Sequence, residues 1–192
     1  MPLTKQIKTI LLFNVIYITL FGAFAVYREN WEFLFYVSIV GFFFFLLLKK
    51  HQTLGLTPGV LWGLSVWGLI HMMGGNIPVN GSVLYNVQLI PIFLKYDQLV
   101  HAFGFGVTTV VGWQLIRPYL KETYNRVTIG ILIVMIGMGA GALNETLEFI
   151  ATVIVPETNV GGYLNTSLDL IFNMLGASIA AVYIMSREKK RM

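Results

Sequence analysis

The stretch VGFFFFLLLKK, Val40 to Lys50, places nine apolar or glycine residues directly before two lysines. It closes an apolar run that begins at Trp31. A helix needs about 20 mainly apolar residues to cross a hydrocarbon core about 30 Å thick, and basic residues are typical of the ends of such helices. The run from Trp31 to Leu48 therefore predicts a transmembrane helix that ends at a membrane surface.

The composition extends this prediction to the whole chain. Hydrophobic residues make up 56% of the 192 residues and charged residues only 11%, whereas soluble domains contain about 25% charged residues. The chain has no cysteine, which excludes disulfides, thiolate nucleophiles, iron–sulfur clusters and cysteine-ligated zinc. We predict an all-α, polytopic membrane protein with a single domain over residues 1–192.

Five further apolar runs complete a predicted bundle of six transmembrane helices. The predicted spans are Ile7–Val26, Trp31–Leu48, Thr57–Met73, Tyr96–Ile116, Val127–Val155 and Leu164–Met185. The segment Val83–Leu94 is apolar but too short to span, and Pro91 interrupts it. We therefore expect an interfacial or re-entrant segment beside the fourth helix.

The first span has an alternative interpretation as a secretory signal peptide. The basic sequence KQIK precedes it, and AFA near its end is similar to a cleavage site. A signal peptide has an apolar core of about 7–15 residues, and this run is longer. We therefore expect a helix that is retained in the fold.

Basic residues predict the orientation of the bundle, because lysine and arginine near helix ends stay in the cytoplasm. With six spans, Arg28 and Lys95 fall on one side, and the other 11 of the 13 basic residues fall on the opposite side: Lys5, Lys8, Lys49, Lys50, Arg117, Lys121, Arg126, Arg187, Lys189, Lys190 and Arg191. Both termini are then cytoplasmic (N-in/C-in). The predicted location of the protein is the inner membrane of a bacterium. The net charge of +4 reflects contact with anionic lipid head groups, and no nucleic-acid partner is expected.

This orientation brings polar residues of four helices to one depth near the outer surface. Asp97 lies at the start of the fourth span, and His101 lies one turn, about 6 Å, deeper. The rise of about 1.5 Å per residue places six more residues at a similar level: His71, Asn144, Glu145, Glu148, Asp169 and Asn173. We predict that these residues form one site.

The electrostatic cost of burial indicates what such a site must contain. An ionised carboxylate inside a membrane costs about 2.5–3.5 kcal/mol, and four of the nine acidic residues fall in this group. The other five are expected in loops or tails: Glu29, Glu32, Glu122, Glu157 and Glu188. Lys95, at the rim, is the nearest basic residue. The four carboxylates therefore need protons, cationic partners or a metal ion.

Residue spacing supports the prediction that these polar residues face one interior site. Taken alone, each residue could instead have a purely structural role. Three pairs are four residues apart and so lie on one helix face each: Asp97 and His101, Asn144 and Glu148, Asp169 and Asn173. Glycine and alanine in FGFG, GMGAGAL and LGASIAA let helices approach closely. Taken singly, the aspartates could cap helices, the glutamates could lie beyond the membrane, and His71 and Asn173 could be packing residues.

The residue types favour a divalent metal. Imidazole and carboxylate side chains suit Zn²⁺, Mn²⁺ or Fe²⁺, and we predict four ligands: Asp97, His101, Asp169 and His71. Glu145 and Glu148 are the predicted catalytic bases beside a metal-activated water, and Asn144 and Asn173 are the predicted supporting residues. The glycines of GMGAG follow no strand, so no nucleotide cofactor is expected.

Three motifs carry a resemblance to known families. YDQLVHAFGFG, NETLEFI and SLDLIFNMLGA, within Tyr96–Ala181, resemble the pattern of VanZ-like membrane proteins, and are more similar to the uncharacterised bacterial inner-membrane family of YjdF type. The resemblance implies six site residues: Asp97, His101, Glu145, Glu148, Asp169 and Asn173. It does not include His71, which is predicted only from its depth in the third span. VanZ-like proteins are associated with low-level resistance to glycopeptide antibiotics, and the YjdF type brings no activity.

The leading functional hypothesis is a metal-dependent hydrolase or transferase that acts on a lipid or lipid-linked cell-envelope substrate. One alternative is a proton- or cation-coupled transporter in which the carboxylates carry protons. Another is a structural or partner-binding membrane module whose polar network only joins helices. Membrane lipids are the expected partners, and the oligomeric state stays open.

Overall fold

The computed structural model describes residues 4–91, 93–121 and 123–188. Six long helices make up most of the chain: α1 (Lys5–Tyr27), α2 (Trp31–Leu54), α3 (Pro58–Asn76), α4 (Tyr96–Ile116), α5 (Arg126–Ile154) and α6 (Tyr163–Glu188). The all-α prediction is confirmed, with one helix for each predicted span. All of these helices except α3 are long and apolar enough to cross a membrane.

α2 continues beyond the lysines that were expected to end it. Gly55, with a φ of 63°, adopts the left-handed conformation after Leu54. Glycine pays no steric penalty there, and its backbone N–H caps the carbonyl of Gln52. The helix therefore ends at a glycine cap, one and a half turns after Lys49.

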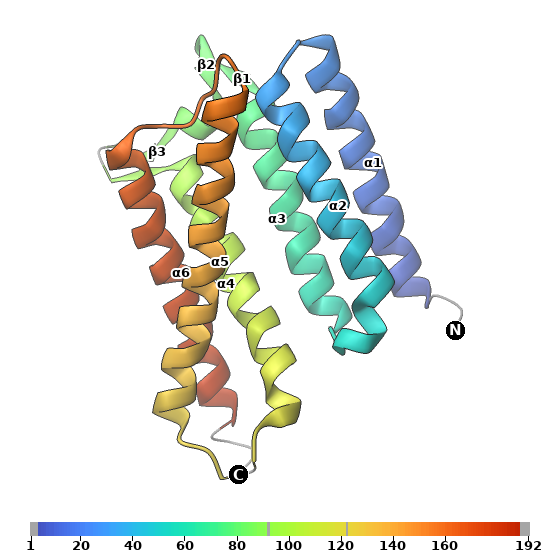
Figure 1. The fold of residues 1–192 in the computed structure, drawn as a ribbon, viewed down its shortest axis with the longest axis vertical. Helices are drawn as coiled ribbons and strands as arrows, with labels where there is room; N and C mark the ends of the chain where they lie inside the picture. The colour runs from blue at the N-terminus through green and yellow to red at the C-terminus, as the bar shows by residue number, and fades with distance from the viewer. Residues whose placement is uncertain (1–3, 92, 122, 189–192) are drawn as a thin grey trace.

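The helices form two groups of three that meet along α3 and α4 (Figure 1). In the first group, α1 packs on α2 and α3, and in the second, α4 packs on α5 and α6. Figure 1 places the start of α1 and the end of α6 toward the lower end of the molecule. The α1–α2 turn and the α5–α6 connection lie at the upper end.

α1 is joined to α3 by buried hydrogen bonds. The Asn14 side-chain amide donates to Ser65 Oγ at 2.6 Å, and Tyr17 donates to Asn14 Oδ1 at 2.9 Å. Asn14 is 2% exposed, so these bonds form away from water. The first helix is therefore packed against α3.

α4 and α6 pack backbone against backbone. A Cβ added to Gly106 would lie 3.2 Å from the Gly176 carbonyl oxygen, and a Cβ added to Gly176 would overlap the Ala102 carbonyl oxygen. Gly104 instead faces the Trp67 indole of α3. The FGFG sequence therefore contacts both a neighbour in its own group and the other group of helices.

The connection from α3 to α4 consists of short irregular elements and contains no re-entrant helix among its described residues. It contains β1 (Pro78–Val79), β2 (Ser82–Val83), the 3-10 turn η1 (Leu84–Asn86), β3 (Gln88–Ile90) and β4 (Leu94–Lys95). β1 pairs with β2 and β3 with β4, both antiparallel. Asn80 and Gly81, with φ of 48° and 80°, make the first tight turn. The alternation of turns and short pairings explains why this apolar segment does not form a helix.

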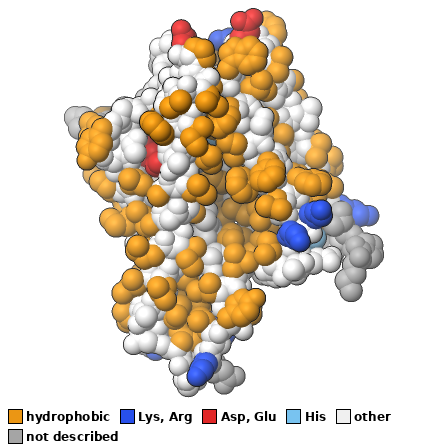
Figure 2. Space-filling view, viewed as in Figure 1, with side chains coloured by type: hydrophobic (Ala, Val, Ile, Leu, Met, Phe, Trp, Pro, Cys, Tyr) orange, Lys and Arg blue, Asp and Glu red, His pale blue; other side chains and the backbone are white. Residues whose placement is uncertain are grey.

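Charged side chains gather toward the ends of the molecule (Figure 2). On the face shown, most Lys and Arg side chains lie in the lower half and one lies at the top, whereas acidic side chains lie at the top and, in one place, lower down among hydrophobic side chains. Near the lower end, Arg117, which begins the 3-10 turn η2 (Arg117–Tyr119), pairs with Glu188 at 3.2 Å. Four residues in the charge argument, Glu122, Lys189, Lys190 and Arg191, lie outside the described residues.

Candidate functional site

His101 lies at the centre of the predicted polar cluster. It lies in the second turn of α4 and is 5% exposed. Its Nε2 atom is 3.6 Å from Asp97 Oδ1 and 3.9 Å from Glu148 Oε1, and its Nδ1 atom is 3.6 Å from Glu145 Oε1. One imidazole therefore faces three carboxylates, which come from α4 and α5.

Asn173 of α6 determines which imidazole nitrogen is free. Its Oδ1 atom lies 3.0 Å from His101 Nδ1, and an amide oxygen can only accept a hydrogen bond. Nδ1 therefore carries the proton of the neutral ring, which leaves the Nε2 lone pair directed toward Asp97 and Glu148. A histidine that donates from one nitrogen to a fixed acceptor while the other is free is typical of metal-binding sites.

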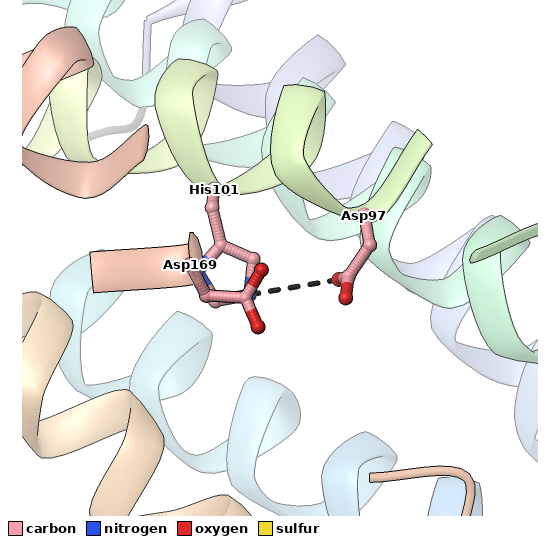
Figure 3. A group of neighbouring side chains, drawn as sticks. All are labelled: Asp97, His101 and Asp169. Carbon is pink, nitrogen blue, oxygen red and sulfur yellow. Dashed lines mark ion pairs between the residues drawn. The ribbon is translucent and has the colours of Figure 1, made fainter. Parts of the chain in front are cut away.

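Asp97 and Asp169 are connected through Asn165, which lies one turn before Asp169 on α6. The Asn165 amide donates to Asp97 Oδ2 at 3.2 Å and to Asp169 Oδ2 at 2.6 Å. Figure 3 shows Asp97 and His101 projecting from α4 toward Asp169 of α6, with the ion pair between the first two as a dashed line. One amide group thus holds the two aspartates close together beside the imidazole.

The fifth helix contributes Asn144, Glu145 and Glu148. Asn144 donates to Glu148 Oε1 at 2.8 Å, which orients that carboxylate toward His101. Glu145 points to the other edge of the ring, and its side chain is 9% exposed. All three residues were predicted, and α5 presents them on the face that packs toward α4 and α6.

Three buried polar atoms in this cluster lack hydrogen-bond partners: Glu145 Oε1, Asp169 Oδ1 and Asn173 Nδ2. Asp169 and Asn173 are both 0% exposed. A buried carboxylate oxygen without a partner is costly. No Lys or Arg among the described residues pairs with any of the four carboxylates. The nearest such contact is at the rim, where Lys95 Nζ donates to Asn165 Oδ1 at 3.4 Å.

The cluster contains two groups of atoms that could hold a cation. One consists of Asp97, His101 and Asp169, and the other of His101, Glu145 and Glu148, and in each group the donor atoms lie within 4.8 Å of one another. Donor atoms bound at about 2.0–2.2 Å to one ion lie roughly 3–4 Å apart. A small inward movement of the side chains would bring either group to that spacing, and a cation in the first group would give the unpaired Asp169 oxygen a partner.

His71 does not join these groups, contrary to its predicted role as a ligand. It lies on α3 among the rings of Phe33, Tyr36, Trp67 and Tyr85, with ring centroids 5.5–6.1 Å away. Burial, followed by the negative charge of Asp97, raises the pKa of Tyr85 well above its usual value. The Tyr85 hydroxyl therefore keeps its proton and hydrogen-bonds to His71 Nδ1, which occupies that nitrogen.

Two residues of this region differ from the prediction: Asn165 was not predicted as a site residue, and Glu32 was predicted in a loop. Asn165, which joins the two aspartates, was missed, although its spacing of four from Asp169 was a usable signal. Glu32 was expected in a loop, but it lies in the first turn of α2, is 6% exposed and accepts from the Asn159 backbone N–H at 2.7 Å. The α5–α6 connection covers it, and that contact joins residues far apart in the chain.

These features define a class: a membrane protein of bundled helices with a buried histidine–carboxylate site. The chain belongs to the DUF2238 family, described as predicted membrane proteins, whose model matches residues 7–190. No curated protein and no solved structure matches the chain. The family match covers α1 from residue 7, the other five long helices and the whole candidate site. The resemblance to VanZ-like proteins stays a prediction.

Proposed function

We propose that the His101 cluster binds a divalent cation and that the protein is a metal-dependent hydrolase or transferase of the membrane. The observation that carries this proposal is the buried, unpaired Oδ1 atom of Asp169, which lies in a group of three potential ligands with Asp97 and His101. A cation there would offset the mutual repulsion of the carboxylates. Zn²⁺, Mn²⁺ and Fe²⁺ suit this mixture of imidazole and carboxylate donors.

The proposed setting is a bundle of six spans in a bacterial inner membrane, with both termini in the cytoplasm. The even number of helices brings the start of α1 and the end of α6 to one end, and the candidate site lies toward the other. The excess of Lys and Arg toward the lower end in Figure 2 supports the same orientation. The site would then face the outer leaflet, where lipid and lipid-linked envelope substrates are available.

The proposed chemistry divides the residues into two roles. Asp97, His101 and Asp169 would hold the cation, which supplies an activated water or a polarised substrate oxygen when bound. Glu148 lies near the same ring nitrogen as Asp97, Nε2, whereas Glu145 lies near Nδ1. Glu148, oriented by Asn144, is the better placed to accept or return a proton as general base or acid.

Metal analysis of detergent-purified protein tests this proposal. We expect one bound divalent ion per chain in the wild type and loss of that ion in Asp169→Asn. Glu32→Gln is a matched control, because Glu32 is also a buried carboxylate but belongs to neither ligand group. The proposal would be overturned if the wild type contained no bound metal and its thermal stability did not change on addition of Zn²⁺, Mn²⁺ or EDTA. Equal loss of metal in both variants would overturn the assigned ligand group.

A further inference from the structure

An apolar groove runs between α2 and α5 and ends at the candidate site. Its cavity has a volume of about 310 Å³, which is in the range of ligand pockets, roughly 300–1,000 Å³. Residues of α1, α2, α3, α4 and α5 line it. Its walls are mainly aliphatic and aromatic, and include Val40, Leu47, Leu64, Val111, Leu143 and Leu147. Figure 1 shows α2 and α5 facing each other across this part of the molecule.

The groove extends from the level of the candidate site to the lower ends of α1, α2 and α3, where Ile7, Leu48 and Leu61 line it. On α2 its lining runs from Tyr36 to Leu48, which corresponds to about 18 Å of helix at about 1.5 Å per residue. Half of a hydrocarbon core about 30 Å thick is roughly 15 Å. The groove runs along the helix axes, passes the midplane of the proposed bilayer, and has room along its length for an extended lipid chain.

The polar groups in the lower part of the groove already have partners. Asn14, Tyr17 and Ser65 line it, and their side chains bond to one another and to backbone carbonyls of their own helices. They therefore demand no polar ligand. A hydrocarbon chain can lie beside these three side chains without breaking a hydrogen bond, whereas the buried Nε1 atom of Trp67, which also lines the groove, has no hydrogen-bond partner.

The upper end of the groove is continuous with the candidate site. Tyr36, His71 and Asn144 line it, and Asn144 donates directly to Glu148. A molecule that fills the groove would thus have an apolar part along α2 and α5 and a polar end beside Glu148. This is the shape of a lipid and not that of a water-soluble substrate.

We infer that the groove binds an acyl chain of a membrane phospholipid, with the head group of that lipid at the His101 site. The inference rests on the proposed function for the position of the head group. The chain-binding part depends only on the shape and lining of the groove. It names the substrate class of the site as a membrane phospholipid.

Photolabelling in vesicles tests the inference. The full chain is reconstituted with phosphatidylglycerol that carries a diazirine near the end of one acyl chain, and labelled residues are mapped by mass spectrometry. We expect label at groove residues such as Leu64 and Val111, and also at Ile179, which is 70% exposed and reports bulk lipid. Excess unlabelled phosphatidylglycerol should reduce the groove label.

Two alanines of α5 provide a matched pair of variants. Ala140 lines the groove, and Ala142 is exposed outside it. We expect Ala140→Phe to reduce the groove label several-fold and to leave the label at Ile179 unchanged, whereas Ala142→Phe should change neither. Equal groove labelling in both variants would overturn the inference. So would displacement of the label by polyprenyl phosphate but not by phosphatidylglycerol.

Metal content, measured on the same samples, separates the two proposals. If Ala140→Phe retains its metal and its groove label is unchanged, the groove inference is wrong and the metal site stands. If the wild type binds no metal, but its groove is labelled and Ala140→Phe loses that label, the metal proposal is wrong and the inference that the groove binds a lipid chain stands.

Discussion

The Asn173 amide oxygen lies 3.0 Å from His101 Nδ1, and both side chains are almost completely buried. This contact joins α4 to α6 and determines the protonation of the imidazole, so that Nε2 faces the carboxylates of Asp97 and Glu148.

The first prediction concerns this contact. Asn173→Ala should weaken Zn²⁺ or Mn²⁺ binding about 10- to 100-fold, the usual effect of losing the partner that orients a ligating histidine, as measured by titration calorimetry. Asn76→Ala is the control, because Asn76 is buried but its amide bonds to the Met72 carbonyl of its own helix. The same affinity in wild type and Asn173→Ala would contradict the assigned role.

The second prediction concerns repulsion among the carboxylates. Glu145 presents a buried oxygen without a hydrogen bond toward His101. In EDTA, Glu145→Gln should raise the thermal unfolding temperature, because it removes one of several like charges. With metal at 100 times the dissociation constant, the wild type should gain about 2.7 kcal/mol, and the variant should gain less. A variant that is destabilised in EDTA and gains as much as the wild type would show that this carboxylate is structural.

The third prediction separates the two histidines. His101→Gln should abolish metal binding, since His101 belongs to both ligand groups. His71→Gln should retain the metal and lose about 1 kcal/mol of stability, the usual value of one hydrogen bond, because its partner is Tyr85. Metal content and thermal unfolding, measured together, check both results. Loss of metal in His71→Gln would restore His71 to the ligand set.

The fourth prediction concerns two glycines. Gly176→Ala should lower the unfolding temperature strongly, because its Cβ would overlap the Ala102 carbonyl and push α4 from α6. Gly139→Ala meets nothing within 4 Å, so it should be neutral or stabilising by up to about 1 kcal/mol through helix propensity. Similar changes in both variants would mean that helix propensity and not the close approach of α4 and α6 dominates.

Much of the site could be predicted because depth along a helix follows from sequence. Counting 1.5 Å per residue from the expected helix ends brought Asp97 and His101 level with Glu145, Glu148 and Asp169, and the structure places these side chains around one imidazole. The number of helices followed from apolar runs in the same way.

Depth alone does not give the direction in which a side chain points around its helix, and this is why His71 was assigned wrongly. His71 is at a suitable level, but α3 turns it toward Phe33, Tyr36 and Tyr85. The burial of Glu32 depends on the α5–α6 connection, through a contact 127 residues away in sequence. No local pattern around Glu32 contains that information.

The approach of Gly176 to Ala102 fixes more than the distance between two helices. Ala102 follows His101 directly, and Gly176 lies two turns after Asp169 on α6. The distance between the proposed ligands His101 and Asp169 is therefore determined by contact between the two helix backbones and not by long, adjustable side chains. A binding site with fixed distances between its ligands selects ions by their radius, whereas a site with flexible ligands adapts to ions of different radii. We therefore expect the glycine pair to determine which divalent ion the protein prefers, although neither glycine touches the ion.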